Sequence, residues 1–240
     1  MLKSKDKFVF TGGNGRFGQV LKKKLKKKNF IFPTKNQLNI LNLNSIISFV
    51  DKHNPKYFVH MAALSRPMSI HEKDIKKSID VNIIGTANVT KICSEKNIKL
   101  IYFSTQYVYP GKDGNYKEDD FLFPINNYGW SKLGGECSVM MYKNSLILRL
   151  SMTERPFIHK SAFYDSYSNF IFHDEIVPIL FKVYKKKGIL NLGGPRKSIY
   201  QFAKKYNPNI QGISVKKFKN KFPSDPSMSL NKLNQILKND

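Results

Sequence analysis

The sequence predicts an α/β fold built on a doubly wound parallel sheet, with a small C-terminal lobe. Short apolar runs alternate with helical segments through residues 1–150 of the 240-residue chain, which is typical of parallel sheets. A glycine-rich turn joins the first strand to the first helix. After about Ser151 the alternation becomes less regular. We therefore expect residues 1–150 to form the main domain and residues 151–240 a small lobe at the carboxyl edge of the sheet, where such folds bind ligands.

Apolar periodicity and turn residues indicate the individual elements. The expected strands are residues 8–11, 29–32, 57–62, 100–104, 146–150 and 189–192. The expected helices are residues 19–28, 45–52, 75–96, 128–142, 173–187, 199–206 and 229–237.

Composition argues against several classes of protein. The net charge is +24, but only five of the 41 basic residues are arginine. Base-reading surfaces favour arginine, so we expect no specific nucleic-acid binding. Cys93 and Cys137 have no metal-ligand spacing, so we expect reduced thiols and no metal site. The chain has no apolar run of about 18 residues, which predicts a cytoplasmic protein without membrane insertion.

The glycine turn is suited to a dinucleotide. Gly12, Gly15 and Gly18 follow the strand at 8–11 and open a helix. The first glycine permits the tight turn, the second lets the backbone approach a phosphate, and the third lets the helix pack on the strand. The helix N-terminus attracts the pyrophosphate. These features predict a Rossmann domain that binds NAD(P), although glycine-rich turns without a ligand also occur.

The end of the second strand bears on the choice of cofactor. An acidic residue there binds the ribose 2′-hydroxyl of NAD(H), but this chain has Phe32-Pro33-Thr34-Lys35. Lys35 could attract a 2′-phosphate, which slightly favours NADP(H) over NAD(H). The alternative is that Lys35 is one more surface lysine.

Tyr128 and Lys132 form a candidate proton-transfer pair. Their i, i+4 spacing puts them on one helical face. A phenol has a pKa near 10, and a neighbouring ammonium lowers it toward the working range of an acid–base catalyst. Lys132 could also bind the nicotinamide ribose. Thr105, at the end of the strand at 100–104, could hold a carbonyl oxygen.

Together these motifs resemble the extended short-chain dehydrogenase/reductase family over about residues 7–150. The matching segments are TGGNGRFG (11–18), VHMAALS (59–65), DVNIIGT (80–86), FSTQYVY (103–109) and YGWSKLGGE (128–136). Residues 103–136 are most similar to the dTDP-4-dehydrorhamnose reductases. The resemblance implies an NAD(P)-dependent oxidoreductase that reduces a keto group on a nucleotide-linked deoxysugar, in dTDP-rhamnose and polysaccharide biosynthesis. It also suggests a homodimer.

The resemblance implies roles for the matching positions. The catalytic residues would be Thr105, Tyr128 as proton donor, and Lys132. The cofactor would contact Gly12, Gly15, Arg16, Phe17, Gly18, Ala62 and Ala63. Asn82 would lie at the cofactor site and anchor the active-site helix or a water. Ser65 and Arg66, after the third strand, could contact substrate.

Departures from the reductase pattern keep alternatives open. Gln106 and Asn39 stand where the reductases often carry aspartate, and the C-terminal part is shorter than in typical members. Gln106-Tyr107 cannot supply the acid and base that sugar-nucleotide dehydratases need. A nucleotide-sugar epimerase, which would use the same Tyr128 and Lys132, and a non-catalytic NAD(P)-binding regulatory subunit remain the alternatives to the reductase.

Overall fold

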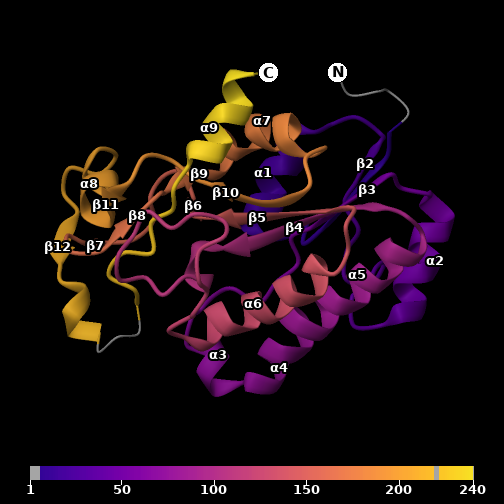
Figure 1. Ribbon diagram of the computed structural model, residues 1–240, viewed down its shortest axis with the longest axis horizontal. Helices are drawn as coiled ribbons and strands as arrows, with labels where there is room; N and C mark the ends of the chain where they lie inside the picture. The colour runs from indigo at the N-terminus through magenta and orange to yellow at the C-terminus, as the bar shows by residue number, and fades with distance from the viewer. Residues whose placement is uncertain (1–5, 219–221, 240) are drawn as a thin grey trace. The chain divides into compact units, whose positions relative to one another are not determined.

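A computed structural model describes residues 6–218 and 222–239 of the chain (Figure 1). The chain divides into two compact units that interleave along the sequence. The first unit contains the residues up to Ser104, Ser131–Ile147 and Lys185–Gly188. The second contains Thr105–Trp130, Leu148–Tyr184 and the chain from Ile189 onward. The expected division at residue 150 stays a prediction, since neither unit is one continuous stretch of chain.

The central sheet has six strands in the order β10-β5-β4-β3-β1-β2. Their bounds are β1 Phe8–Thr11, β2 Phe30–Ile31, β3 Tyr57–His60, β4 Lys99–Thr105, β5 Ser145–Leu150 and β10 Gly188–Leu192. Strand β1 pairs in parallel with β2 and β3, and β3 pairs in parallel with β4. The predicted α/β fold with a parallel sheet is confirmed. The strand order reverses next to β1, and this kind of switch point opens a crevice at the carboxyl ends of the strands.

Helices of the first unit cover both faces of its strands. They are α1 Arg16–Lys24, α2 Leu43–His53, α3 Ile70–Lys73, α4 Ile75–Ile79, α5 Gly85–Glu95 and the greater part of α6 Asn127–Met140. In Figure 1, α5 and α6 lie below the strands and α1 lies above them. The helix expected at 75–96 contains a π-helical turn, η1 Asp80–Ile84, between α4 and α5. Such turns are often found at functional sites.

Two helices begin earlier than the sequence predicts, because of local capping. Helix α1 starts at Arg16, since Gly15 has an extended backbone and serves as its N-cap. Helix α2 starts at Leu43, since the Asn42 side chain accepts a hydrogen bond from the Ser45 N–H. The early start of α1 directs the free N–H groups of its first turn toward the glycine turn.

The described part of the second unit contains short paired strands and, besides the first turn of α6, further helices. The helices are α7 His173–Val183, α8 Ile199–Lys204 and α9 Asn231–Lys238, close to the expected positions. The sequence did not predict the 3-10 turns η2 Gln106–Val108 and η3 Val215–Phe218, nor β6 Met152–Thr153, β7 Ser161–Phe163, β8 Tyr167–Ser168, β9 Ile171–Phe172, β11 Lys197–Ser198 and β12 Gln211–Ile213. Strands of two or three residues are too short to show an alternating pattern.

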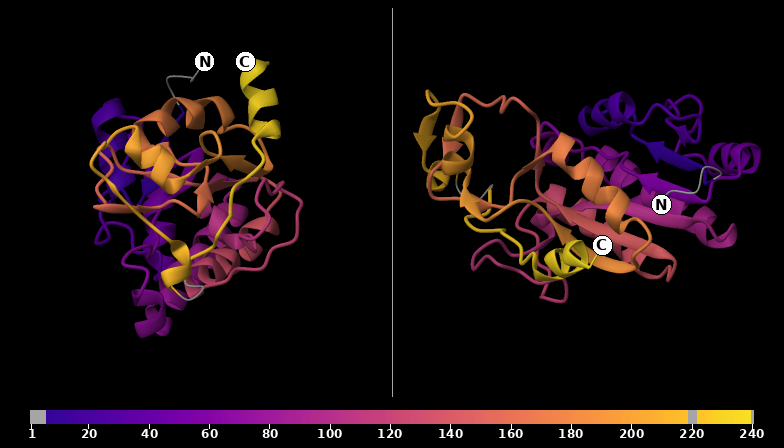
Figure 2. Two further views of the ribbon diagram at one scale, coloured as in Figure 1. Left: turned by 90° about the vertical axis from the view of Figure 1, so that its left-hand side faces the viewer. Right: turned by 90° about the horizontal axis from the view of Figure 1, so that it is seen from above.

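A small hydrophobic core supports this part of the second unit. Strand β7 pairs in parallel with β12, and α8 lies beside them (Figure 2). The buried side chains of the cluster are Phe157, Ala162, Ala203 and Ile210. None of the described helices is both long enough and apolar enough to cross a membrane.

Candidate active site

The glycine turn between β1 and α1 needs glycine for two different reasons. Gly12 has φ +75°, and a Cβ there would lie 2.8 Å from the backbone N of Ala62. A Cβ on Gly18 would lie 2.5 Å from the Gly12 carbonyl oxygen. That oxygen accepts a hydrogen bond from the Gly15 N–H over 2.9 Å. Helix α1 therefore packs directly on the turn, and its first turn carries no acidic side chain that would repel an anion.

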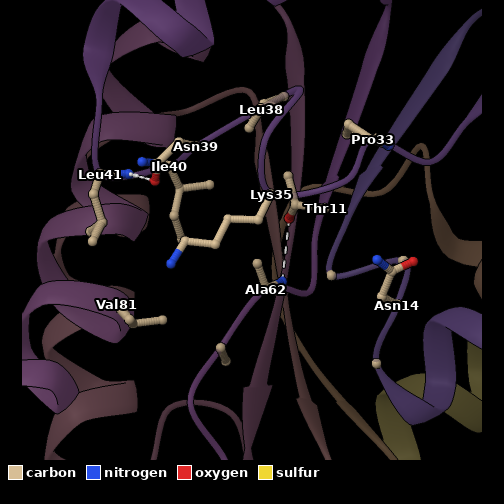
Figure 3. A pocket seen from close by; sticks show the side chains of 14 residues that line it. Thr11, Asn14, Pro33, Lys35, Leu38, Asn39, Ile40, Leu41, Ala62 and Val81 are labelled. Atoms are coloured by element: carbon tan, nitrogen blue, oxygen red, sulfur yellow. Dashed lines mark hydrogen bonds between the residues drawn. The ribbon is translucent and has the colours of Figure 1, made fainter.

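A pocket of about 260 Å³ lies beside this turn, entirely within the first unit (Figure 3). Apolar side chains form much of its wall, and Lys35 contributes a cationic group. Figure 3 shows the Lys35 side chain extending into the pocket with its amino group directed toward Leu41 and Val81. The lining residues are Thr11, Gly12, Gly13, Asn14, Gly15, Pro33, Lys35, Leu38, Asn39, Ile40, Leu41, Ala62, Ala63 and Val81.

Several of the residues expected to bind the cofactor line this pocket. They are Gly12, Gly15, Lys35, Ala62 and Ala63. The pocket lining does not include Arg16, Phe17, Gly18 or Asn82, whose contacts with a cofactor stay predictions. Phe17 and Gly18 are buried at the start of α1, with the Phe17 ring against Phe103.

Sequence reasoning missed part of the pocket wall, chiefly Leu38, Ile40 and Val81. Leu38 and Ile40 are both buried in the loop after β2. The apolar–polar–apolar pattern of Leu38-Asn39-Ile40 is the sequence signal for this part of the wall. Val81 belongs to the π-helical turn η1, and no sequence pattern indicated that turn.

A buried polar network supports the floor of the pocket. The Thr11 hydroxyl accepts hydrogen bonds from the N–H groups of Met61 and Ala62, over 3.2 and 3.3 Å. His60 Nδ1 lies 2.8 Å from that hydroxyl, and Nε2 lies 3.2 Å from the hydroxyl of Thr86. Burial, with a smaller contribution from Lys132, lowers the pKa of His60 to about 3. The imidazole is therefore neutral, and it lies fully buried on β3.

Helix α6 carries Tyr128 and Lys132 one helical turn apart. Glycines bring the helix close to its neighbours in the first unit: a Cβ on Gly135 would lie 2.5 Å from Tyr102 Oη and 2.7 Å from the Asn82 carbonyl oxygen. Asn82 Nδ2 donates a hydrogen bond to Ser131 Oγ over 2.8 Å. The π-helical turn is thus bonded to α6 at Ser131, the residue before Lys132.

Lys132 is a buried cation. Its side chain is nearly inaccessible, with 2% of the residue exposed, and Nζ lies 4.1 Å from the centre of the Tyr102 ring. Burial lowers the pKa of Lys132 to about 7, while the negative charge of Glu136 acts in the opposite direction. A lysine with such a pKa can change protonation state near neutral pH.

Thr105 and Tyr128 both belong to the second unit, where Tyr107 contacts each of them. The Thr105 hydroxyl accepts a hydrogen bond from the Tyr107 N–H over 3.3 Å. The rings of Tyr107 and Tyr128 meet edge to face, with their centres 6.0 Å apart. A Cβ on Gly129 would collide with the Tyr107 carbonyl oxygen. Close packing around η2 thus brings the end of β4 to the beginning of α6.

Gln106 is held by Ser168 of the same unit, which in turn contacts Ser151. Its Nε2 donates to Ser168 Oγ over 2.9 Å, and the Ser151 hydroxyl lies 2.6 Å from that of Ser168. All three groups are neutral amides or hydroxyls, so this cluster does not supply the acid and base of a dehydratase.

The expected substrate residues Ser65 and Arg66 lie in the loop between β3 and α3, the serine half-buried and the arginine exposed. They are not part of the pocket lining, and their role stays a prediction.

In the described part of the chain, no group of three His, Cys, Asp or Glu side chains could hold a metal ion. Cys93 and Cys137 are free thiols, the first buried and the second exposed.

Comparison with known proteins gives a match to one family model and similarity to two kinds of protein, a methionine adenosyltransferase subunit and dTDP-4-dehydrorhamnose reductases. A family model described as the RmlD substrate binding domain matches residues 6–153. Methionine adenosyltransferase 2 subunit beta from Pongo abelii is 29% identical over 141 residues, covering 55% of this chain and 42% of the relative. A dTDP-4-dehydrorhamnose reductase from Aggregatibacter actinomycetemcomitans is 27% identical over 239 residues, covering 93% of this chain and 75% of the relative.

Solved structures agree on the fold. A dTDP-4-dehydrorhamnose reductase from Bacillus anthracis, crystallised in complex with NADP, superposes with a TM-score of 0.86 and 24% sequence identity. The match covers 96% of this chain and 92% of that structure. The chain thus extends over nearly all of the reductase fold, but over less than half the length of the adenosyltransferase subunit.

Proposed function

This chain belongs to the family described by the RmlD substrate binding domain, and on that premise we propose that it is an NAD(P)H-dependent oxidoreductase of the extended short-chain dehydrogenase/reductase type. Its reaction is the reduction of a keto group on a nucleotide-linked deoxysugar, as the name of the similar dTDP-4-dehydrorhamnose reductases describes. One observation carries this proposal. Helix α6 presents Tyr128 one turn before a buried lysine, Lys132.

The chemistry follows from the three candidate catalytic side chains. Bound reduced nicotinamide supplies a hydride to the carbonyl carbon of the sugar. Tyr128 Oη donates its proton to the carbonyl oxygen, and the Lys132 ammonium stabilises the phenolate that remains. Thr105 donates a hydrogen bond that holds the carbonyl oxygen in place. A positioned general acid of this kind contributes about 10²–10⁴-fold to the rate.

The pocket in the first unit is our candidate site for the cofactor. Its glycine turn and the N-terminus of α1 suit a pyrophosphate, and its apolar side chains Leu38, Ile40 and Val81 suit the flat face of a base. We propose a preference for NADPH. Lys35 lines the pocket without a hydrogen-bond or ion-pair partner among the residues that the structure describes. A 2′-phosphate would give its ammonium a counter-charge.

The first experiment is a turnover assay with a matched pair of variants. Purified protein is mixed with NADPH or NADH and a panel of nucleotide-linked 4-keto-6-deoxysugars, and loss of reduced-nicotinamide absorbance is followed. We expect oxidation that Tyr128→Phe lowers at least about 10²-fold. Tyr142→Phe is the control, because its hydroxyl donates to the Ile98 carbonyl beyond the end of α6. Equal activity in wild type and Tyr128→Phe would refute the role of Tyr128.

A second candidate is a non-catalytic regulatory subunit that binds NAD(P). It is supported by the similarity to methionine adenosyltransferase 2 subunit beta. In that case cofactor binding would persist without oxidation of any sugar in the panel. A partner enzyme would then respond equally to wild-type protein and to Tyr128→Phe.

Assembly and location stay predictions. Ile75, Ile79 and Ile84 expose apolar side chains along α4 and η1, which fits a surface covered in a homodimer. Light scattering on the purified protein tests this, since a monomer at working concentration would contradict it. A cytoplasmic location fits a reaction that consumes NADPH.

A further inference from the structure

We infer that Tyr102 is a positioning residue for Lys132, whose ammonium lies against its ring and whose backbone it binds through its hydroxyl. This inference rests on the proposed function, in which Lys132 serves Tyr128 and the cofactor ribose. Tyr102 belongs to none of the motifs described above. Both residues lie in the first unit, Tyr102 on β4 and Lys132 on α6.

Tyr102 contacts Lys132 at both ends of the lysine. Its Oη donates a hydrogen bond to the Lys132 carbonyl oxygen over 3.3 Å. The Lys132 Nζ lies 4.1 Å from the centre of the same ring, well within the range of a cation–π interaction. The tyrosine is completely buried, with 0% of its surface exposed.

The Tyr102 ring stabilises the Lys132 ammonium electrostatically. Burial disfavours the charged form of Lys132, and the negative face of an aromatic ring offsets part of that penalty. Glu136, on the same helix, acts in the same direction. His60, on β3, lies on Tyr102 with ring centres 5.7 Å apart. It stays neutral, because burial and the charge of Lys132 keep its pKa low.

The same contacts connect the lysine to the floor of the pocket. Tyr102 packs on His60, His60 Nδ1 contacts Thr11 Oγ1, and that hydroxyl accepts the Ala62 N–H. Ala62 lines the pocket. A continuous set of buried contacts within the first unit therefore fixes the distance between Lys132 and the candidate cofactor site.

The neighbouring helix is shaped to accept a tyrosine at this position. A Cβ on Gly135 would lie 2.5 Å from Tyr102 Oη, so the hydroxyl occupies space that only glycine leaves open. A phenylalanine would fill the core equally well without needing that space. The Tyr102 hydroxyl and Gly135 therefore indicate that Tyr102 binds α6 specifically, in addition to filling the core.

The test reads the position of Lys132 directly, with no cofactor or substrate present. In protein labelled with ¹³C at the lysine ε carbon, the Lys132 methylene resonance is assigned by its loss in Lys132→Arg. A methylene over the face of a ring resonates upfield, and it shows a through-space contact to the Tyr102 ring protons. We expect both signals in wild type and in Tyr102→Phe, which keeps the ring. We expect the upfield shift to disappear in Tyr102→Leu.

The titration of the same resonance gives an independent readout. Without the ring the ammonium loses stabilisation, so the pKa of Lys132 should fall by about one unit in Tyr102→Leu. Phe58→Leu is the matched control, because Phe58 is equally buried in the adjacent strand β3. It should leave the Lys132 titration unchanged. In an active enzyme, the decline of kcat with rising pH should move to lower pH by the same amount.

Each outcome bears on the inference separately from the proposed function. A normal Lys132 methylene shift in wild type, with no contact to the ring protons, overturns the inference even if Tyr102→Leu does not fold. Unchanged shift and titration in a folded Tyr102→Leu also overturn it. If the signals appear as expected while no sugar is reduced, the positioning of Lys132 stands and the proposed reaction fails.

Discussion

Asn82 and Ser131 join two helical segments through one hydrogen bond, in which Nδ2 of the amide donates to the serine hydroxyl over 2.8 Å. The same amide also pairs with the backbone of Leu64, accepting from its N–H over 2.8 Å and donating to its carbonyl over 2.9 Å. Asn82 thus ties the π-helical turn both to the loop after β3 and to α6, next to Lys132. The π-helical turn η1 therefore places the Asn82 amide where it can bond both segments.

Replacing Asn82 with alanine should lower both stability and activity. The substitution leaves the Leu64 backbone and the Ser131 hydroxyl without their partner in a buried place, which costs about 1–3 kcal/mol of the free energy of unfolding. Asn29→Ala is the control, because its side chain donates a hydrogen bond to the Asp6 carbonyl, away from the pocket. Urea unfolding and kcat measure the two effects. A kcat that falls no more in Asn82→Ala than in the control would contradict the role of Asn82 in holding α6.

Gly18 and Gly15 should respond differently to alanine. A Cβ on Gly18 would lie 2.5–2.6 Å from the backbone of Gly12 and Gly13, which cannot yield without moving the turn. We expect Gly18→Ala to cost about 1–3 kcal/mol of unfolding free energy and to abolish cofactor binding. A Cβ on Gly15 would meet only the Gly12 oxygen, at 3.1 Å. Gly15→Ala should therefore keep most of the stability and still weaken cofactor binding, because the methyl group occupies the approach of the pyrophosphate.

Thermal unfolding and fluorescence titration with NADPH separate these two effects. Equal losses of stability in Gly18→Ala and Gly15→Ala would show that the close approach of α1 to the turn is not what requires glycine at position 18.

Lys35 should determine the preference between the two nicotinamide cofactors. Lys35→Met removes the ammonium that lines the pocket and should weaken NADPH binding about tenfold, since a charge-assisted contact to phosphate is lost. NADH binding should change little. Lys28→Met is a suitable control, because Lys28 is exposed and lies outside the pocket lining. If both cofactors weaken equally in Lys35→Met, the lysine contributes to general attraction and not to recognition of the 2′-phosphate.

The features that could be predicted from the sequence are those determined by local spacing. The glycine turn, the strand before it and the helical pair Tyr128 and Lys132 each depend on residues within a few positions of one another. The contact between Tyr102 and Lys132 depends on how β4 and α6 pack, and no periodicity encodes that register. The pocket residue Val81 was missed for a related reason. It enters the wall because η1 departs from α-helical geometry, whereas an apolar pattern at 75–96 indicates one regular helix.

The second unit shows the same limit. Its helices α7 and α9 have apolar faces long enough to be predicted. Strands β7 and β12 are three residues each and pair across about fifty positions, with Ser161 opposite Gln211. Such pairing depends on the folded chain and leaves no local pattern.

His60 should make the stability of the protein sensitive to acid. Its pKa is lowered from 6.5 to about 3 in the folded protein, first by burial and then by the charge of Lys132. Below pH 6.5 the unfolded chain takes up a proton at His60 that the folded protein does not bind until the pH approaches 3. The contribution of His60 to stability is therefore complete above pH 6.5 and declines as the pH falls through this window, by at most about 1.4 kcal/mol per pH unit. Urea unfolding at neutral pH and at about pH 5 measures the decline, which should be shallower in His60→Gln than in wild type. His159→Gln, at an exposed histidine, should keep the wild-type dependence, and an equally steep decline in His60→Gln would assign the acid sensitivity to other groups.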